Sequence, residues 1–171
     1  GGLRARPRRR ASERTGGFTG SDAGADIVLG QLAVTGDVDV QTNGAGGDAT
    51  VVNTIALDLA TSAVGGDLDA TATTGNLTDA GVVTVGGTAG FTTSAADADI
   101  DLGQLAVTGD VDVQTNGANG DATVVNTIAL DLATSTVGGD LDATASERKS
   151  TRLNPSHTPV SHAASCLENK K

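Results

Sequence analysis

Aromatic residues are almost absent from this sequence. It has 171 residues, of which two are phenylalanine, and it has no tryptophan, tyrosine or methionine. Aromatic rings supply much of the buried area of an ordinary globular core, about 150–250 Å² each. The apolar residues here are chiefly Val, Ala, Leu and Ile. A fold built from such small side chains must have a narrow interior.

Basic residues are absent from the middle of the chain. Residues 15–145 contain 18 aspartates and no Glu, Lys, Arg, His, Cys or Pro. All 11 lysines and arginines lie in Gly1–Arg14 and Ser146–Lys171, so the formal charge of −10 combines an acidic middle with two basic ends. This charge sign excludes nucleic acid as a partner of the middle. No segment has the 18 or more apolar residues of a membrane span, so we expect no membrane insertion.

The middle also lacks the groups that most enzymes use as bases and nucleophiles, because it has no His, Lys, Cys, Tyr or Glu. Glycosidases work with paired carboxylates, but the aspartate pairs here recur with every repeat, which is typical of a structural motif. A polysaccharide-cleaving enzyme is therefore disfavoured. We expect no enzymatic activity.

What the middle does contain is a long internal duplication. The stretch "TGDVDVQTNG" occurs at Thr35–Gly44 and again at Thr108–Gly117. At an offset of 73, residues 15–72 align with residues 88–145, and only seven of these 58 positions differ. Such a duplication is typical of repeat architectures. We divide the chain into a basic head (1–14), a repeat region (15–145, with copy one at 15–87 and a partial copy two at 88–145) and a basic tail (146–171).

Each copy contains short runs of alternating apolar and polar residues. In "GDVDVQT" the side chains of Val38 and Val40 point to one face and those of Asp39 and Gln41 to the other, which predicts a half-buried strand. Similar glycine-led motifs begin at Gly36, Gly66, Gly87 and Gly109, in steps of 30, 21 and 22 residues. This spacing predicts about three coils of roughly 24 residues per copy.

Two all-β folds agree with this pattern. An immunoglobulin-type β-sandwich, with one domain per copy, needs large inward residues to fill a core about 10 Å thick. One phenylalanine per copy serves that purpose poorly. We favour a parallel β-helix (solenoid), in which small aliphatic residues stack from coil to coil and each coil pairs with the next. We expect Phe18 and Phe91 to fill the same interior slot in successive copies. For Asn43, Asn53, Asn116 and Asn126, turn residues and members of an amide ladder remain alternatives.

The stretch "VGGDLDATATTGNLTDAGVVTVGGTAGFTT" at Val64–Thr93 resembles the repeats of large secreted adhesins of the filamentous haemagglutinin type, which have a "GG-L-TATTG-(I/L)-T-G-TVGGTA-F" rhythm. The resemblance covers residues 15–145. It implies a right-handed parallel β-helix, export across the outer membrane and a place at the bacterial cell surface or in the matrix. The usual "GNLTVTA" of that family is replaced here by "GDLDATA", which puts Asp where Asn and Thr are expected.

We therefore expect a non-catalytic structural segment, a stalk, of a large secreted bacterial surface adhesin-like repeat protein involved in adhesion or matrix formation. No cofactor is expected for this role. Its partners would be glycans or proteins of a host or neighbouring cell surface, bound through other parts of the parent protein. Open coil ends would also allow end-to-end self-association. The absence of cysteine from residues 15–145 suits export as an unfolded chain.

The alternative is a calcium- or glycan-binding module that uses rows of aspartates. Equivalent positions of neighbouring coils lie about 4.8 Å apart. Like charges at that spacing repel by roughly 0.9 kcal/mol per pair in water. Staggering, screening by salt or a bound calcium ion would each relieve this repulsion. The candidate calcium ligands are the aspartates of the repeated GD-h-D motifs, namely Asp37, Asp39, Asp67, Asp69, Asp110, Asp112, Asp140 and Asp142. A solvated acidic face and a calcium site both remain open.

The two ends differ from the middle in character as well as in charge. "RKSTRLN" at Arg148–Asn154 resembles translated sequencing-adapter DNA, and "PRRRASER" at Pro7–Arg14 resembles the opposite adapter more loosely. We expect both ends to be non-native or disordered, and the middle to be an internal slice of a longer protein. The alternatives are a nucleic-acid-binding arm for the head and a zinc site of His157, His162 and Cys166 for the tail.

Overall fold

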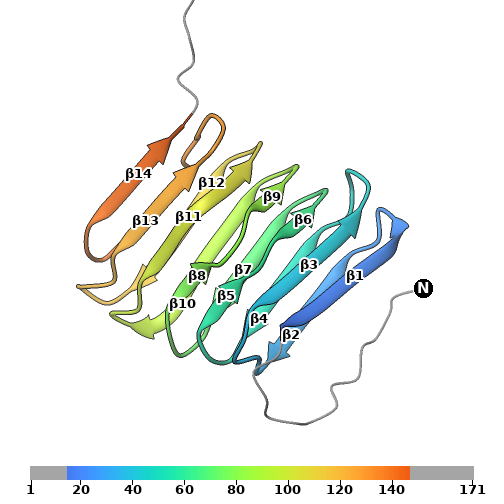
Figure 1. The fold of residues 1–171 in the computed structure, drawn as a ribbon. Helices are drawn as coiled ribbons and strands as arrows, with labels where there is room; N and C mark the ends of the chain where they lie inside the picture. Colours follow the sequence, from blue (N-terminus) through green and yellow to red (C-terminus); the bar gives the residue numbers. More distant parts are fainter. Residues whose placement is uncertain (1–14, 147–171) are drawn as a thin grey trace, which may run out of the picture.

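The computed structural model describes residues 15–146, and the expectations for the basic head, for most of the basic tail and for a zinc site lie outside this range. The described chain winds into a stack of coils with β1 at one end and β14 at the other (Figure 1). Within this range every regular element is a strand, and no helix is long and apolar enough to cross a membrane. The strands are β1 (Gly16–Ala23), β2 (Ile27–Leu32), β3 (Val38–Asn43), β4 (Ala49–Asn53), β5 (Leu57–Leu59), β6 (Ser62–Val64), β7 (Leu68–Ala72), β8 (Leu77–Asp79), β9 (Val83–Val85), β10 (Ala89–Ala96), β11 (Ile100–Val107), β12 (Val111–Asn116), β13 (Ala122–Asn126) and β14 (Leu141–Ala145).

The strands form two parallel sheets on opposite sides of the coil. The first sheet has nine strands and contains β1, β3, β5, β6, β8, β9, β11, β13 and β14. The second has five strands in the order β12-β10-β7-β4-β2. Every strand pairs in parallel with the equivalent strand one coil away, as β2 pairs with β4 and β4 with β7. The predicted parallel solenoid is therefore confirmed over the antiparallel sandwich.

The coils are slightly shorter than the predicted 24 residues. Ile27 pairs with Ala49 across 22 residues, whereas Ala49 pairs with Leu68 across 19. The longest step, from Leu77 to Ile100, is 23 residues. A coil in this range fits three and a half times, rather than three times, into the 73-residue duplication.

The extra half coil places the two copies on opposite sheets. In copy one, β1 pairs with β3 in the first sheet, beginning at Gly16 opposite Val38. The equivalent strands of copy two, β10 and β12, pair in the second sheet with the same register, beginning at Ala89 opposite Val111. Both pairs also have an irregularity in register at the same position, before Ala23 and before Ala96. Copy two is therefore a close structural repeat of copy one, related to it by about half a turn of the coil.

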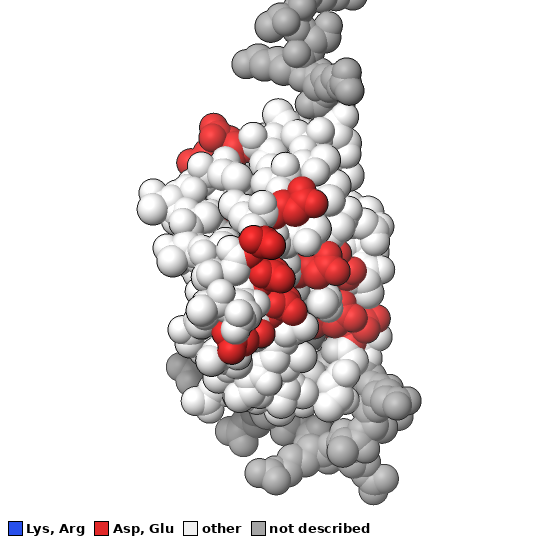
Figure 2. Space-filling model, turned by 90° about the vertical axis from the view of Figure 1, so that its left-hand side faces the viewer, with Lys and Arg blue, Asp and Glu red and all other residues white. Residues whose placement is uncertain are grey.

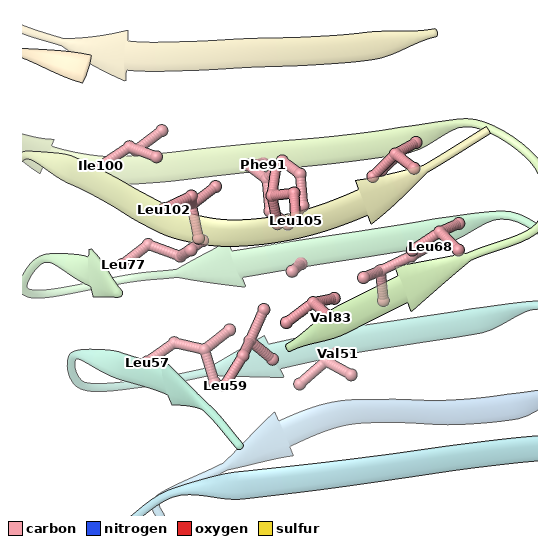
Figure 3. Close-up of a cluster of buried hydrophobic side chains, with 14 of the residues drawn as sticks. Val51, Leu57, Leu59, Leu68, Leu77, Val83, Phe91, Ile100, Leu102 and Leu105 are labelled. Carbon is pink, nitrogen blue, oxygen red and sulfur yellow. The ribbon is translucent and has the colours of Figure 1, made fainter. Parts of the chain in front are cut away.

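The core is a column of small aliphatic side chains between the two sheets (Figure 3). Inward positions such as Val38, Val40, Leu57 and Leu59 have no exposed surface, and the outward residues between them are polar. Fully burying one such side chain stabilises the fold by about 1.5–3 kcal/mol. The alternation that predicts the strands is thus the alternation that fills this column.

The two phenylalanines do occupy equivalent interior positions, but in different sheets. Phe91 lies in β10 of the second sheet and is fully buried. Phe18 lies in β1 of the first sheet and is only half-buried, packed against the edge of the core. The difference follows from position, because β1 belongs to the end coil and pairs on one side only.

Paired glycines allow neighbouring coils to approach closely at one corner. A Cβ atom on Gly65 would overlap the carbonyl oxygen of Gly44 in the preceding coil. Gly86 stands in the same relation to the carbonyl oxygen of Gly65. The "GG" that precedes the strands is therefore required by coil-to-coil contact, because any side chain there would push the coils apart.

Two of the asparagines between residues 15 and 146 are fully buried, and neither is a turn residue or part of a side-chain ladder. Asn53 ends β4, and its Oδ1 accepts the N–H of Val34 at 3.0 Å. Its Nδ2 donates to the carbonyl oxygens of Val34 at 2.8 Å and Ala56 at 2.6 Å. Asn126 makes the equivalent three bonds in copy two, to Val107 and Ala129. Each side chain therefore satisfies the backbone of a corner that leaves the sheet.

Candidate functional site: the aspartate rows

The most distinctive surface of the molecule is acidic. Aspartate side chains gather over several neighbouring coils on the face seen in Figure 2, and no lysine or arginine occurs between residues 15 and 146. Most of the aspartates occupy one of two kinds of position. Some stand at a corner, immediately before a strand, and others point outward from the middle of a strand. The two kinds have different surroundings.

The corner aspartates form ladders that run from coil to coil. In the first ladder, the carboxylate of Asp26 accepts the backbone N–H of Asp48 at 3.1 Å. The Asp48 carboxylate accepts the N–H of Asp67 at 2.9 Å, and that of Asp67 accepts the N–H of Thr88 at 2.7 Å. Each acidic side chain thus caps the start of the strand in the next coil.

A second ladder runs along another corner. It begins with an amide, since Oδ1 of Asn76 accepts the N–H of Asp99 at 3.0 Å. Asp99 accepts from Asp121 at 3.0 Å, and Asp121 accepts from Asp140 at 2.8 Å. Asp48 and Asp121 are equivalent residues of the two copies, so the ladders share one design. We refer below to these two series as the aspartate ladders.

The glycine of the "GD" motif makes room for the ladder. A Cβ atom on Gly66 would overlap the carboxylate of Asp48. One on Gly139 would overlap that of Asp121 in the same way. The pairing of Gly with Asp therefore has a structural cause: glycine admits the carboxylate of the coil before, and the aspartate supplies the carboxylate for the coil after.

The strand-centre aspartates are staggered. In the first sheet the outward positions of successive coils read Asp58, Thr78, Asp101, Thr123 and Asp142. In the second sheet they read Thr50, Asp69, Gly90 and Asp112. Within each of these two rows, an uncharged residue therefore separates one strand-centre carboxylate from the next. The spacing within a row rises from about 4.8 Å to about 9.6 Å, which is close to the Debye length of about 10 Å at 0.1 M salt.

Two of the strand-centre aspartates also pair with an amide on their own strand. Gln41 donates from Nε2 to the carboxylate of Asp39 at 2.7 Å and to the carbonyl oxygen of Thr61 in the next coil at 3.0 Å. Gln114 makes the same contact with Asp112 at 2.7 Å in copy two. Because the copies are half a turn apart, this Asp–Gln pair occurs once on each sheet.

The eight aspartates predicted as calcium ligands fall into these classes. Asp67 and Asp140 belong to the ladders, and Asp37 and Asp110 occupy the corner position before β3 and β12. Strand-centre positions hold the other four, Asp39, Asp69, Asp112 and Asp142. The structure brings Asp67 beside Asp48, which the prediction did not include, but it places Gly90 between Asp69 and Asp112. Within residues 15–146, no group of three or more His, Cys, Asp or Glu side chains is arranged around a common point as metal ligands would be. Calcium binding by these rows stays a prediction.

Sequence reasoning missed the least ordinary carboxylate, that of Asp79. Its Oδ1 accepts the N–H of Gly103 at 2.9 Å and its Oδ2 accepts the N–H of Gln104 at 2.7 Å. Burial raises the pKa of Asp79 above its ordinary value of 3.8; the two N–H donors oppose this shift, and the charges of Asp101 and Asp58 add to it. Asp79 is the last residue of β8. It pairs with Leu59 of the preceding coil, which is fully buried.

Asp58 lies nearby in the same sheet and is unusual in a second way. Its Oδ1 is buried and has no hydrogen-bond partner among the described residues. Buried carboxylate oxygens are normally paired. No sequence signal distinguishes Asp58 and Asp79 from the other aspartates, because their environment depends on which coil lies above and below them.

Comparison with known proteins bears on the repeat and not on an activity. Residues 46–103, which run from the turn after β3 into β11, match a family described as "Repeats of unknown function (DUF5649)". No curated protein matches the chain. No solved structure matches it either. The family description supports a repeat protein, in agreement with the duplication and the stacked coils.

Proposed function

We propose that residues 15–146 form a non-catalytic stalk segment of a large secreted bacterial surface repeat protein, adhesin-like in its role in adhesion or matrix formation. The parent protein would be exported to the cell surface. Other parts of it would bind glycans or proteins of a host or neighbouring cell. The coiled segment would hold such binding parts at a distance.

The observation that carries this proposal is the continuity of bonding along the coil axis. Backbone pairing runs from β1 to β14 through every coil, and the aspartate ladders add side-chain bonds in the same direction. The hydrophobic column is likewise continuous. A rod bonded in this way lengthens by a fixed rise with each coil and depends only on its neighbours for stability. Those are the properties that a spacer requires.

Force spectroscopy on the full chain tests this proposal. The chain would be stretched between handles at its two ends. We expect it to resist extension and then to lengthen in steps that release whole coils of 19–23 residues. At about 3.3–3.6 Å per extended residue, one coil corresponds to about 60–80 Å. A featureless extension, like that of the same chain in concentrated urea, would count against a stalk that withstands force.

The rival proposal is a calcium- or glycan-binding module that uses the aspartate rows. The buried oxygen of Asp58, which has no hydrogen-bond partner within residues 15–146, lies near the perturbed carboxylate of Asp79 and favours this interpretation over a plain acidic surface. Thermal melts with millimolar calcium and with EDTA, and a glycan panel probed with the isolated chain, separate the two proposals. A calcium-dependent rise in Tm that is lost in the D58N variant would support the module. Equal melts and a glycan panel without binding would leave the stalk.

A further inference from the structure

The two ends of the described solenoid expose side chains that are buried in the other copy. Leu141 in β14 is 43 % exposed, whereas the equivalent Leu68 in β7 is 1 % exposed. At the other end, Phe18 in β1 is half-buried, whereas Phe91 in β10 is completely buried. Leu68 and Phe91 have a neighbouring coil on both sides. Among the described residues, Leu141 and Phe18 have one on one side only. Each end is therefore complementary to a coil that the described residues do not supply.

A strand pair within the chain, which we call the template, shows what would fit against each open end. β14 is the copy-two equivalent of β7, and β1 is the copy-one equivalent of β10. Within the chain β7 and β10 are direct neighbours, with Leu68 opposite Ala89 and Asp69 opposite Gly90. An offset of 73 converts this pairing into Leu141 opposite Gly16 and Asp142 opposite Gly17. The open face of β14 thus meets, in β1, the partner that β7 already has.

A specific contact at the template distinguishes this register from others. A Cβ on Gly90 would lie 2.8 Å from Oδ1 of Asp69, so the glycine makes room for the carboxylate of the coil before. Gly17 has open space at the same point, since no atom of residues 15–146 lies within 4 Å of its Cβ position. Asp142 is exposed. Gly17 is equivalent to Gly90, and Asp142 is equivalent to Asp69. Within one chain these two residues lie at opposite ends of the solenoid, so they could make the equivalent contact only between two chains.

The backbone groups match as well. In the template, the N–H of Leu68 donates to the carbonyl oxygen of Thr88 at 2.9 Å. Leu141 and Thr15 occupy these positions at the open edges of β14 and β1. Gly16 donates its N–H toward β3, to the carbonyl oxygen of Asp37 at 2.7 Å, so the alternation of a parallel strand directs the N–H of Thr19 to the open edge.

We propose that a second copy of this chain docks head to tail, with its β1 extending the first sheet beyond β14 in the register of β7 and β10. The inference rests on the fold and on the duplication, and it does not require the proposed stalk function. The interface is heterologous, so it leaves a free head and a free tail and can propagate into a filament.

The half-coil mismatch between copies limits this contact. Between β7 and β10 the chain passes through β8 and β9 on its way round the coil. At a junction of β14 with β1 the described residues supply no counterpart of that half coil, so the opposite side of the junction is one strand short within the described part of the chain. We therefore expect weak association, visible at hundreds of micromolar protein. A variant with Thr73–Gly87 duplicated directly after Ala145 completes two full copies, and we expect it to associate at least tenfold more tightly.

Edge-blocking variants test the docking. Proline is tolerated where the N–H faces an open edge or at the first residue of a strand, but it removes the donor and obstructs a new neighbour. T19P blocks the head and L141P blocks the tail; T19V and L141V keep the N–H and serve as controls. Circular dichroism and urea unfolding establish that each full-length variant folds.

Sedimentation then distinguishes the modes of assembly. We expect the weight-average mass of the wild type, T19V and L141V to rise with concentration, and T19P and L141P to remain monomeric alone. An equimolar mixture of T19P and L141P should form a dimer that does not grow further, because one free tail meets one free head. A head-to-head or tail-to-tail interface would leave one of the two variants dimeric alone, and a monomeric wild type at millimolar concentration would overturn the proposal.

Disulfide trapping reports the register and does not depend on the proline variants. In the template Thr71 lies opposite Thr92, which converts to Thr144 opposite Thr19. On a C166S background, T144C and T19C chains should form a crosslinked dimer on mild oxidation, because paired positions fall within the Cα separation of about 4.4–6.8 Å that a disulfide needs. D142C and T19C chains, two residues out of register, should crosslink at least tenfold less. Equal yields from the two pairs would overturn the proposed register.

Discussion

The carboxylate of Asp48 accepts the backbone N–H of Asp67, 19 residues later, at 2.9 Å. One acidic residue thereby caps the strand of the next coil, and Asp67 repeats the contact with Thr88. Carboxylates stacked in this way repel one another. Each of them, however, accepts a hydrogen bond from the backbone N–H of a residue in the next coil. Hydrogen bonding to a charged acceptor is worth about 1.5–3 kcal/mol, which exceeds the roughly 0.9 kcal/mol of repulsion between neighbours in water.

This arrangement predicts different outcomes for two substitutions at Asp48. D48A removes the charged acceptor and its repulsion together, so it should lower the free energy of unfolding by the difference between them, about 0.6–2 kcal/mol. D48N keeps an acceptor oxygen and removes a like charge, so it should be close to neutral. The equivalent D121A and D121N variants should behave in parallel. Urea unfolding of the four variants provides the measurement, and a loss in D48N equal to that in D48A would show that charge, and not the cap, is what matters.

The raised pKa of Asp79 predicts a dependence of stability on pH. A carboxyl whose pKa in the folded protein lies above its unfolded value favours the folded state when protonated. The contribution of Asp79 is therefore fully present below the ordinary value of 3.8 and is lost as the pH rises through the higher folded value. The amide introduced by a D79N substitution does not titrate, so this variant provides the reference.

The free energy of unfolding of the wild type relative to D79N should therefore increase as the pH falls from about 7 toward about 3.5. Urea unfolding of both proteins at several pH values measures this difference. A D58N variant offers a control for the neighbouring charge, because removing the charge of Asp58 should lower the folded pKa of Asp79 and reduce the effect. A constant difference between wild type and D79N across this range would contradict the assigned shift.

Much of this fold can be predicted from the sequence, and the part that cannot has a clear physical origin. Alternation in "GDVDVQT" predicts β3 with Val38 and Val40 inside, since side-chain direction in a strand is a local property. Parallel stacking follows from the duplication and the small core. The coil length does not follow, because it depends on where each corner turns. A small error in the length of each coil changes three turns per copy into three and a half, which moves Phe91 to the sheet opposite Phe18.

The same limit applies to the aspartates. The sequence identifies the GD-h-D motif as a repeated feature, but the two aspartates of a motif such as Asp67 and Asp69 have different roles, one in a ladder and one on a strand. Their neighbours are set by inter-coil register. Asp79 was missed for that reason: its two N–H donors, Gly103 and Gln104, belong to the next coil.

The staggered row of the first sheet predicts a charge-dependent loss of stability in T123D. Thr123 lies between Asp101 and Asp142, so a carboxylate there creates two neighbouring like-charge contacts at about 4.8 Å. We expect a loss of about 1–2 kcal/mol at low salt from two repulsions of roughly 0.9 kcal/mol each. Most of it should be recovered in about 1 M NaCl, where the Debye length falls to about 3 Å. T123N matches the shape without the charge, and a loss in T123N equal to that in T123D would assign the effect to packing.

The buried asparagines predict an order of stability among substitutions at one site. In N53A the N–H and carbonyl oxygen of Val34 and the carbonyl oxygen of Ala56 lose their partner, and each buried group left unpaired costs about 1–3 kcal/mol. In N53D a carboxylate faces those two carbonyl oxygens, so a buried charge is added to the lost bonds and the variant should be less stable than N53A at neutral pH. Lowering the pH below about 4 should bring N53D closer to the wild type, because a protonated carboxyl regains one donor. N126A and N126D should show the same order, and chemical denaturation at about pH 7 and about pH 3.5 measures all four. Equal stability of the alanine and aspartate variants at neutral pH would mean that water reaches these corners and satisfies the backbone in place of the amide.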